Sequence, residues 1–174
     1  MEEDFPKQMS AIWAPWRVEY FELPRTGGEG DFLTTAAQAS DDAAHLVVLR
    51  RKSAFLLMNR YPYANGHLMA VPYRKAAELS ELADNEKLEL WSLAEDAQKL
   101  LRATVFAQGF NIGLNHGTCA GAGVPDHLHL HIVPRWAGDT NFMPVLGSTR
   151  VIPQGLVPLY EKLVRARDEL KLAG

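Results

Sequence analysis

Three histidines occupy alternate positions in one short segment, His127-Leu128-His129-Leu130-His131, and this segment constrains the fold more than any other. In a β-strand, alternate side chains point to the same face, so the imidazoles would line one surface about 7 Å apart. The leucines between them would point the other way, into a hydrophobic core. The segment therefore predicts a strand, running to about residue 133, that presents a row of imidazoles from a rigid element.

Two kinds of chemistry use such a row. Three imidazoles can bind zinc or another transition metal, with water in an open position. Alternatively, one neutral imidazole attacks phosphorus while its neighbours hold charge and donate protons. The residues after the row, Pro134-Arg135-Trp136, include no carboxylate to complete a metal triad. The spacing therefore favours phosphate chemistry and leaves a metal-dependent hydrolase as the alternative.

A loop of small residues, 115–124 (NHGTCAGAGV), leads directly into the histidines. Small residues let backbone N–H groups approach an anion closely and permit unusual φ angles. A glycine-containing loop alone is weak support for a phosphate site. Its position before a row of histidines predicts a phosphate cradle beside a nucleophile.

Hydrophobic patterns elsewhere predict an α+β fold with a largely antiparallel sheet. Strand patterns cover 46–49, 55–58, 67–71 and 110–114, in addition to the histidine segment. A long helix precedes the fourth strand, with Asp84 as its N-cap and Gly109 just past its end. An amphipathic segment from Leu156 to Val164 predicts a C-terminal helix. The stretch 26–44 shows neither hydrophobic period and predicts a loop or mobile arm.

Composition limits the partners. The formal net charge is -3, so sequence-independent binding to nucleic acid or to an anionic membrane is not expected. Cys119 is the single cysteine, which rules out an intramolecular disulfide. The N-terminus is acidic and polar, unlike a signal peptide, and no apolar run approaches the ~20 residues of a membrane span. We expect a cytoplasmic protein.

The segment 127–133 matches the His-φ-His-φ-His-φ-φ signature, and the chain resembles the histidine triad (HIT) family. Residues 59–72 (NRYPYANGHLMAVP) are similar to the family's earlier strand, turn and strand. Residues 109–154 resemble bacterial HIT proteins of the diadenosine tetraphosphate phosphorylase or ATP adenylyltransferase type. The resemblance implies a HIT-like fold of about five strands, one long helix and a C-terminal helix, usually as a homodimer joined through the long helix and adjoining strand.

This resemblance divides the chain into an N-terminal arm, partly irregular, over 1–45, a HIT domain over 46–154 and a C-terminal helix over 155–174 packed on the same domain. It implies three catalytic residues. His129 corresponds to the nucleophile that forms a nucleotidyl intermediate, with Nδ1–H bonded to a backbone carbonyl and Nε2 free to attack. His131 corresponds to the residue that contacts the α-phosphate, and His127 to the member that fixes the geometry.

The resemblance also implies binding residues. His67 corresponds to a fourth histidine near the α-phosphate, although a strand histidine bonded to the backbone would look the same. Asn59 corresponds to the residue that bonds the ribose hydroxyls, or is a turn asparagine before Pro62. The remaining expected phosphate contacts are Asn115, Gly121, Ala122, Gly123 and Val124. Phe55 and Leu57 would line the base pocket, or serve equally as core.

Two departures from the family pattern bear on cofactors. Many bacterial relatives hold zinc through two cysteines, a histidine and the first triad histidine. Gly30, Leu33 and Lys75 stand where the first three of those ligands would fall, so structural zinc is not expected and no cofactor is required. The loop also lacks the serine of hydrolase branches, since Gly123 and Val124 stand there. This favours phosphate-type leaving groups, which need little protonation.

The resemblance thus implies an enzyme that cleaves a dinucleoside polyphosphate, or a similar adenine nucleotide conjugate, at its α-phosphorus. Phosphorolysis is favoured over hydrolysis. Arg135, Arg150 and Lys75 could bind the rest of the polyphosphate, or could be solvated surface charges. A nucleotide-binding sensor with weak hydrolase activity is the second hypothesis, and the metal-dependent hydrolase is the third.

Overall fold

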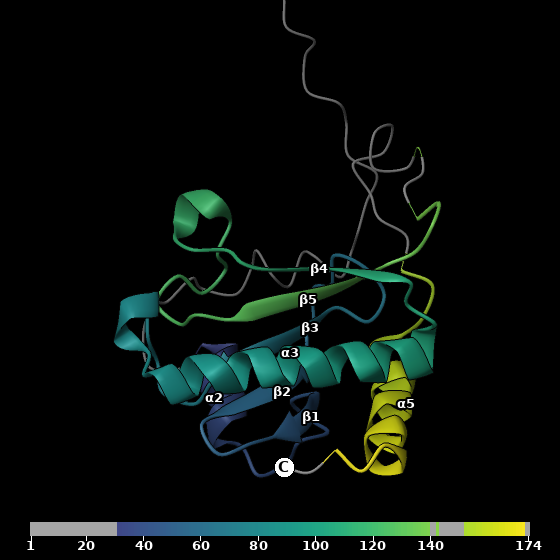
Figure 1. The fold of residues 1–174 in the computed structure, drawn as a ribbon, viewed down its shortest axis with the longest axis horizontal. Helices are drawn as coiled ribbons and strands as arrows, with labels where there is room; N and C mark the ends of the chain where they lie inside the picture. The colour runs from purple at the N-terminus through teal and green to yellow at the C-terminus, as the bar shows by residue number, and fades with distance from the viewer. Residues whose placement is uncertain (1–30, 140–141, 143–151, 173–174) are drawn as a thin grey trace, which may run out of the picture.

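Five antiparallel strands form the sheet that carries the histidines, in the order β1-β2-β3-β5-β4 (Figure 1). The computed structural model describes residues 31–139, 142 and 152–172. The strands are β1 (Val47–Arg50), β2 (Ala54–Met58), β3 (Leu68–Pro72), β4 (Gly109–Leu114) and β5 (Leu130–Arg135). Two short 3-10 helices, η2 (Leu79–Glu81) and η3 (Thr118–Ala120), lie in the connections. The predicted α+β class with a five-stranded antiparallel sheet is confirmed.

Alternate side chains of the central strands point to opposite faces of the sheet and pack into two separate hydrophobic clusters. In β2, Ala54, Leu56 and Met58 belong to a large cluster with α3 (Asp84–Val105) and α5 (Leu156–Glu169). Phe55 and Leu57 point to the other face, into a smaller cluster with α2 (Phe32–Gln38). Every residue of β2 and β3 is buried, because helices cover both faces of these strands.

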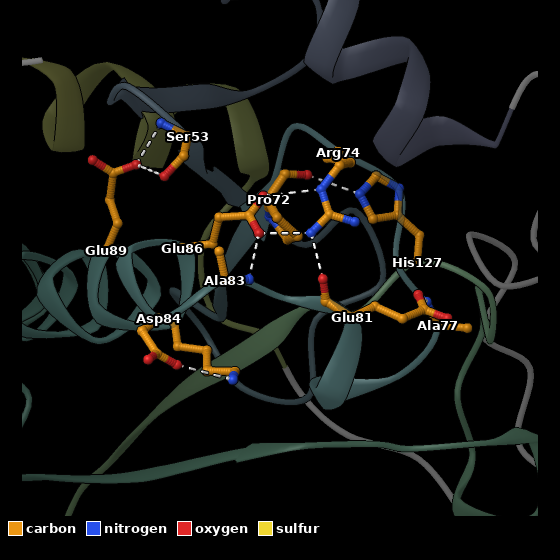
Figure 2. Close-up of polar contacts among 11 residues, drawn as sticks. Ser53, Pro72, Arg74, Ala77, Glu81, Ala83, Asp84, Glu86, Glu89 and His127 are labelled. Atoms are coloured by element: carbon orange, nitrogen blue, oxygen red, sulfur yellow. Dashed lines mark hydrogen bonds and ion pairs between the residues drawn. The ribbon is translucent and has the colours of Figure 1, made fainter.

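The long helix α3 begins one residue earlier than predicted. Its N-cap is Ala83, not Asp84, and the Glu86 carboxylate accepts the Ala83 N–H at 2.7 Å (Figure 2). The same carboxylate pairs with the Arg74 guanidinium at 2.6 Å. Arg74, together with the Ala83 N–H, holds the pKa of Glu86 below its ordinary value. A glutamate from inside the first turn thus replaces the expected side-chain cap.

The C-terminal end of α3 also differs from the prediction. The helix ends at Val105, and Phe106 adopts the left-handed conformation with φ of 55°. Gly109, the expected stop, instead begins β4. The Trp136 indole N–H donates to the Val105 carbonyl at 3.0 Å, which satisfies a carbonyl that the helix leaves unpaired.

The short helix α2 lies in the stretch 26–44 that the sequence predicted as a loop or arm. The Asp31 carboxylate caps it by accepting the N–H groups of Leu33 and Thr34, and Leu33 and Ala36 are buried. Burial by itself raises the pKa of Asp31, but hydrogen bonds from Thr34 and Lys75 outweigh it and lower the pKa. The loop prediction is therefore wrong for 32–38. Two buried positions in seven residues give too short a pattern to recognise.

The predicted C-terminal helix is α5, which packs beside α3 and β1 (Figure 1). Leu159 and Leu163 are fully buried. The Tyr160 hydroxyl donates to the Val47 carbonyl at 3.2 Å, and Arg167 donates to the Val48 carbonyl at 2.8 Å. Side chains of α5 thus cover the outer edge of β1. Among the described residues, no helix combines the length and the apolar character that crossing a membrane requires.

Candidate active site

Four histidines are buried at one side of the sheet. Their exposed fractions are 1% for His67, 0% for His127, and 6% each for His129 and His131. His131 pairs with Met69 of β3, so both side chains point to the face that α2 covers. β5 begins only at Leu130, so the first two triad histidines precede the strand and the predicted strand start at 127 is wrong.

The orientation of His129 follows from one hydrogen bond. Its Nδ1 lies 2.8 Å from the His127 carbonyl oxygen, and a carbonyl can only accept. Nδ1 therefore carries the hydrogen and Nε2 carries the lone pair. Burial, the largest effect, lowers the pKa of His129. The ring is uncharged at neutral pH and presents Nε2 as a nucleophile.

A second hydrogen-bond chain fixes His67 and His131. The Tyr63 backbone N–H donates to His67 Nδ1 at 3.1 Å, so Nδ1 is unprotonated and the hydrogen is on Nε2. His67 Nε2 lies 2.9 Å from His131 Nδ1 and donates to it. Burial lowers the pKa of His131 to about 4, so its remaining hydrogen is on Nε2. No described residue partners that buried Nε2–H, which leaves a donor for a ligand.

His127 has a different environment from the other two triad rings. Its Nε2 donates to the Pro72 carbonyl at 2.9 Å (Figure 2), which ties the approach to β5 to the end of β3. Its Nδ1 has no hydrogen-bond partner among the described residues and lies 3.9 Å from an Asp31 carboxylate oxygen. The His127 ring therefore supports the backbone whose carbonyl orients His129.

The residues at the expected zinc-ligand positions do not fit zinc. Leu33 is apolar and fully buried, and Gly30 lies outside the described residues. The Lys75 ammonium pairs with Asp126 at 2.8 Å and Asp31 at 3.3 Å. Asp126 and Asp31 raise the pKa of Lys75, and a protonated amine has no lone pair to give. Within the described ranges, no three His, Cys, Asp or Glu side chains gather to hold a metal ion.

Two predicted asparagines contact the histidine pair or its neighbour. Asn59 Nδ2 lies 3.3 Å from His67 Nδ1, and Asn59 Oδ1 accepts the Tyr61 N–H at 2.8 Å. Asn115 Nδ2 donates to the Tyr63 hydroxyl at 3.1 Å. Asn59 thus lies against His67 and Asn115 against Tyr63, each with a protein partner in this structure.

The predicted base-pocket and loop residues lie in two environments. Phe55 and Leu57 are essentially inaccessible, and Phe55 stacks on Tyr73 with ring centroids 5.2 Å apart. Val124 is buried in the same cluster. The other expected loop residues, Gly121, Ala122 and Gly123, are exposed or half-buried after η3. The structure therefore places Phe55, Leu57 and Val124 in the core under α2, and the rest of the loop at the surface.

Two of the three positively charged residues suggested for polyphosphate, Arg135 and Lys75, already have acidic or polar partners. Arg135 binds Asp139 through two nitrogens and also donates to Asn111 at 2.7 Å. Lys75 lies between the two carboxylates described above, and Arg150 lies outside the described residues. Sequence reasoning missed Tyr63, which contacts both His67 and His131. The available signal was an aromatic residue within the turn 59–67.

Comparisons with known proteins extend these findings. The family model described as HIT domain matches residues 41–138. A Mycobacterium tuberculosis protein named AP-4-A phosphorylase is 41% identical over 154 residues, covering 84% of this chain and 78% of that protein. A Schizosaccharomyces pombe protein named bis(5'-nucleosyl)-tetraphosphatase (asymmetrical) is 32% identical over 93 residues, 53% of this chain and 50% of that protein.

Solved structures agree on the fold. The crystal structure of a Zn-bound histidine triad family protein from Mycobacterium smegmatis superposes with a TM-score of 0.61 at 23% identity, covering 74% of this chain and 88% of that chain. Fold and site together define an α+β protein that presents one uncharged, oriented imidazole beside a second imidazole with a donor N–H. The chain belongs to the HIT domain family.

Proposed function

We propose that this protein cleaves a dinucleoside polyphosphate at its α-phosphorus, with His129 as the nucleophile. The observation that carries the proposal is that two neighbouring imidazoles have complementary roles. His129 offers a lone pair on its Nε2, and His131 offers a hydrogen on its Nε2. The two ring centroids are 4.8 Å apart. A phosphoryl group between them would meet a nucleophile on one ring and a donor for its oxygens on the other.

The first step forms a bond between His129 Nε2 and phosphorus and breaks the bond from phosphorus to the leaving polyphosphate oxygen, which departs with the electron pair. The nucleotidylated imidazole then carries a positive charge. The His127 carbonyl accepts its Nδ1–H and stabilises that charge. The His131 N–H stabilises the negative charge on the phosphoryl oxygens. In the second step an acceptor oxygen attacks phosphorus and His129 leaves uncharged.

We infer that inorganic phosphate is the acceptor, so that diadenosine tetraphosphate yields ATP in the first step and ADP in the second. Support comes from the M. tuberculosis relative named AP-4-A phosphorylase, which is 41% identical over most of this chain. The absence of a hydroxyl side chain at Gly123 and Val124 agrees, because a polyphosphate leaves without needing a proton donor.

We propose the following substrate contacts from the resemblance to the family. His67 acts on the α-phosphate through His131, and Asn115 with the loop N–H groups of 121–124 bind the phosphates. Asn59 binds the ribose once its present hydrogen bonds to the turn rearrange. Contact of a base with Phe55 and Leu57 requires α2 to move away from β2, because both side chains are now covered.

The test is incubation with diadenosine tetraphosphate, with and without inorganic phosphate. We expect ADP only when phosphate is present, and a fall in turnover of at least ~10³ for His129→Ala, the scale of losing a covalent nucleophile. His45→Ala is the control, a histidine that precedes β1. Turnover of His129→Ala near the parent's contradicts the assignment. Tight nucleotide binding without turnover would favour a sensor, and loss of turnover in chelator would favour a metal enzyme.

We also propose that the protein is a homodimer joined through α3 and β4. α5 covers the β1 edge, but within the described residues no backbone hydrogen bond is made to the outer edge of β4. On α3, Leu88 and Trp91 are 69% and 58% exposed. Trp91 and Leu114 line a groove of about 410 Å³ between α3 and the β4 side of the sheet. An open strand edge beside exposed apolar residues suits a second copy.

A further inference from the structure

Tyr63 contacts three groups on the phosphate side of the site. Its backbone N–H donates to His67 Nδ1 at 3.1 Å. Its ring lies against His67, with centroids 4.6 Å apart, and against His131, with centroids 5.5 Å apart and planes within 29°. Its hydroxyl accepts the Asn115 side-chain N–H at 3.1 Å. One residue therefore joins the β2–β3 turn, the histidine pair and the start of the loop 115–124.

We propose that Tyr63 is a positioning residue for the transfer reaction. Its ring shields His67 and His131 from water, so that both keep their tautomers, and its hydroxyl holds Asn115 toward the phosphates. This inference rests on the proposed function, and adds separate roles for the backbone, the ring and the hydroxyl of one residue. The backbone contact sets which nitrogen of His67 carries the hydrogen. Any side chain keeps that contact, so substitutions at Tyr63 isolate the ring and the hydroxyl.

The ring acts on His131 by excluding water. The titratable rings in contact with His131 are Tyr63, His67 and His129. Burial is the main cause that lowers the pKa of His131 to about 4, and the charge of His129 lowers it further. If water enters, the pKa of His131 rises. A protonated His131 carries a hydrogen on Nδ1, which would face the Nε2–H of His67 and break their hydrogen bond.

The hydroxyl acts on Asn115. That residue directly follows β4 and begins the loop that leads to the triad. The phenol oxygen accepts from its amide and so limits the positions of the loop's first residue. Losing one such bond weakens substrate binding without changing the nucleophile. We expect a rise in KM of about fivefold, on the scale of one neutral hydrogen bond, with kcat nearly unchanged.

The test compares Tyr63→Phe, which keeps the ring, with Tyr63→Leu, which removes it, in the full chain. Tyr61→Leu in the same turn is the control for damage to the turn. We expect Tyr63→Phe to raise KM only. We expect Tyr63→Leu also to move the acidic limb of kcat/KM to higher pH by about one unit, as water reaches His131. The inference is overturned if Tyr63→Leu leaves that limb in place, or if Tyr61→Leu moves it equally.

Nitrogen NMR of the imidazole rings tests the same inference without substrate, so its outcome is separate from that of the proposed function. In the unmodified protein we expect an unprotonated Nδ1 on His67 and a protonated Nε2 on His131. In Tyr63→Leu we expect the pKa of His131 to rise. The reverse tautomers in the unmodified protein contradict the inference, even if Tyr63→Leu fails to fold.

Discussion

The chemistry of each histidine depends on which of its nitrogens is bonded, and residue spacing carries no such information. Alternation in 127–131 predicted a row of imidazoles, and the structure brings His129 and His131 together. His127 instead donates to the Pro72 carbonyl, and the Leu128 N–H donates to the Ala76 carbonyl at 2.8 Å, which bonds this stretch to the segment after β3 before β5 begins. That long-range contact, like the contact between His67 and His131, could not be predicted from local sequence.

The lowered pKa values of His129 and His131 predict activity that persists in mild acid. Burial is the main cause for both rings, and the neutral form is the one that each role requires. Below pH 6.5, the ordinary value, the unfolded chain therefore binds protons that the folded site does not. Folding stability is therefore expected to decrease as the pH is lowered from 6.5 towards about 4, the pKa of His131 in the folded protein.

Measurement of kcat/KM against pH checks this expectation. The acidic limb should lie below pH 6.5, and unfolding in denaturant should show lower stability at the acidic end of the same range. If the acidic limb of the kcat/KM profile lies at or above the ordinary pKa of histidine, the reacting imidazoles are hydrated in the working enzyme.

At the scale of elements, strands with several consecutive apolar residues were predictable, and helix ends were not. The buried strands β2 and β3 and the long helix α3 follow directly from their patterns. The ends of α3 depend instead on Glu86, which reaches back to Ala83, and on Phe106, which adopts a conformation unusual for its type. α2 depends on an Asp31 cap and on a surface for Leu33 that only the assembled sheet provides.

Gly66 in the turn before β3 predicts a loss of stability for Gly66→Ala. Its φ is +84°, and an added Cβ would lie 2.8 Å from Leu101 Cδ2 of α3. Left-handed strain and this close contact together should cost about 1–3 kcal/mol. Gly113→Ala is the matched control, because nothing lies within 4 Å of its Cβ position. Urea unfolding of both variants at one protein concentration checks the difference, and equal midpoints would contradict it.

For the whole molecule, the arrangement of covered and uncovered edges predicts how two copies meet. Trp91 of α3 is 58% exposed on the side where β4 is the last strand. Val157 of α5, the helix at the β1 edge, is 62% exposed and serves as the control. Trp91→Glu should convert dimers to monomers, because a carboxylate would be buried against an apolar partner. Val157→Glu should leave the mass unchanged. Light scattering during size exclusion measures both, and a monomeric parent protein would refute the dimer.

The origin of the four imidazoles has a consequence for kinetics. His67 comes from the β2–β3 turn, and the three triad histidines come from β5 and the segment before it, all within one chain. In the proposed homodimer, each copy therefore carries all four imidazoles of the proposed centre. Saturation curves should be hyperbolic, without cooperativity between centres, and a mixed pair with one inactivated copy should keep half of the throughput of an intact pair.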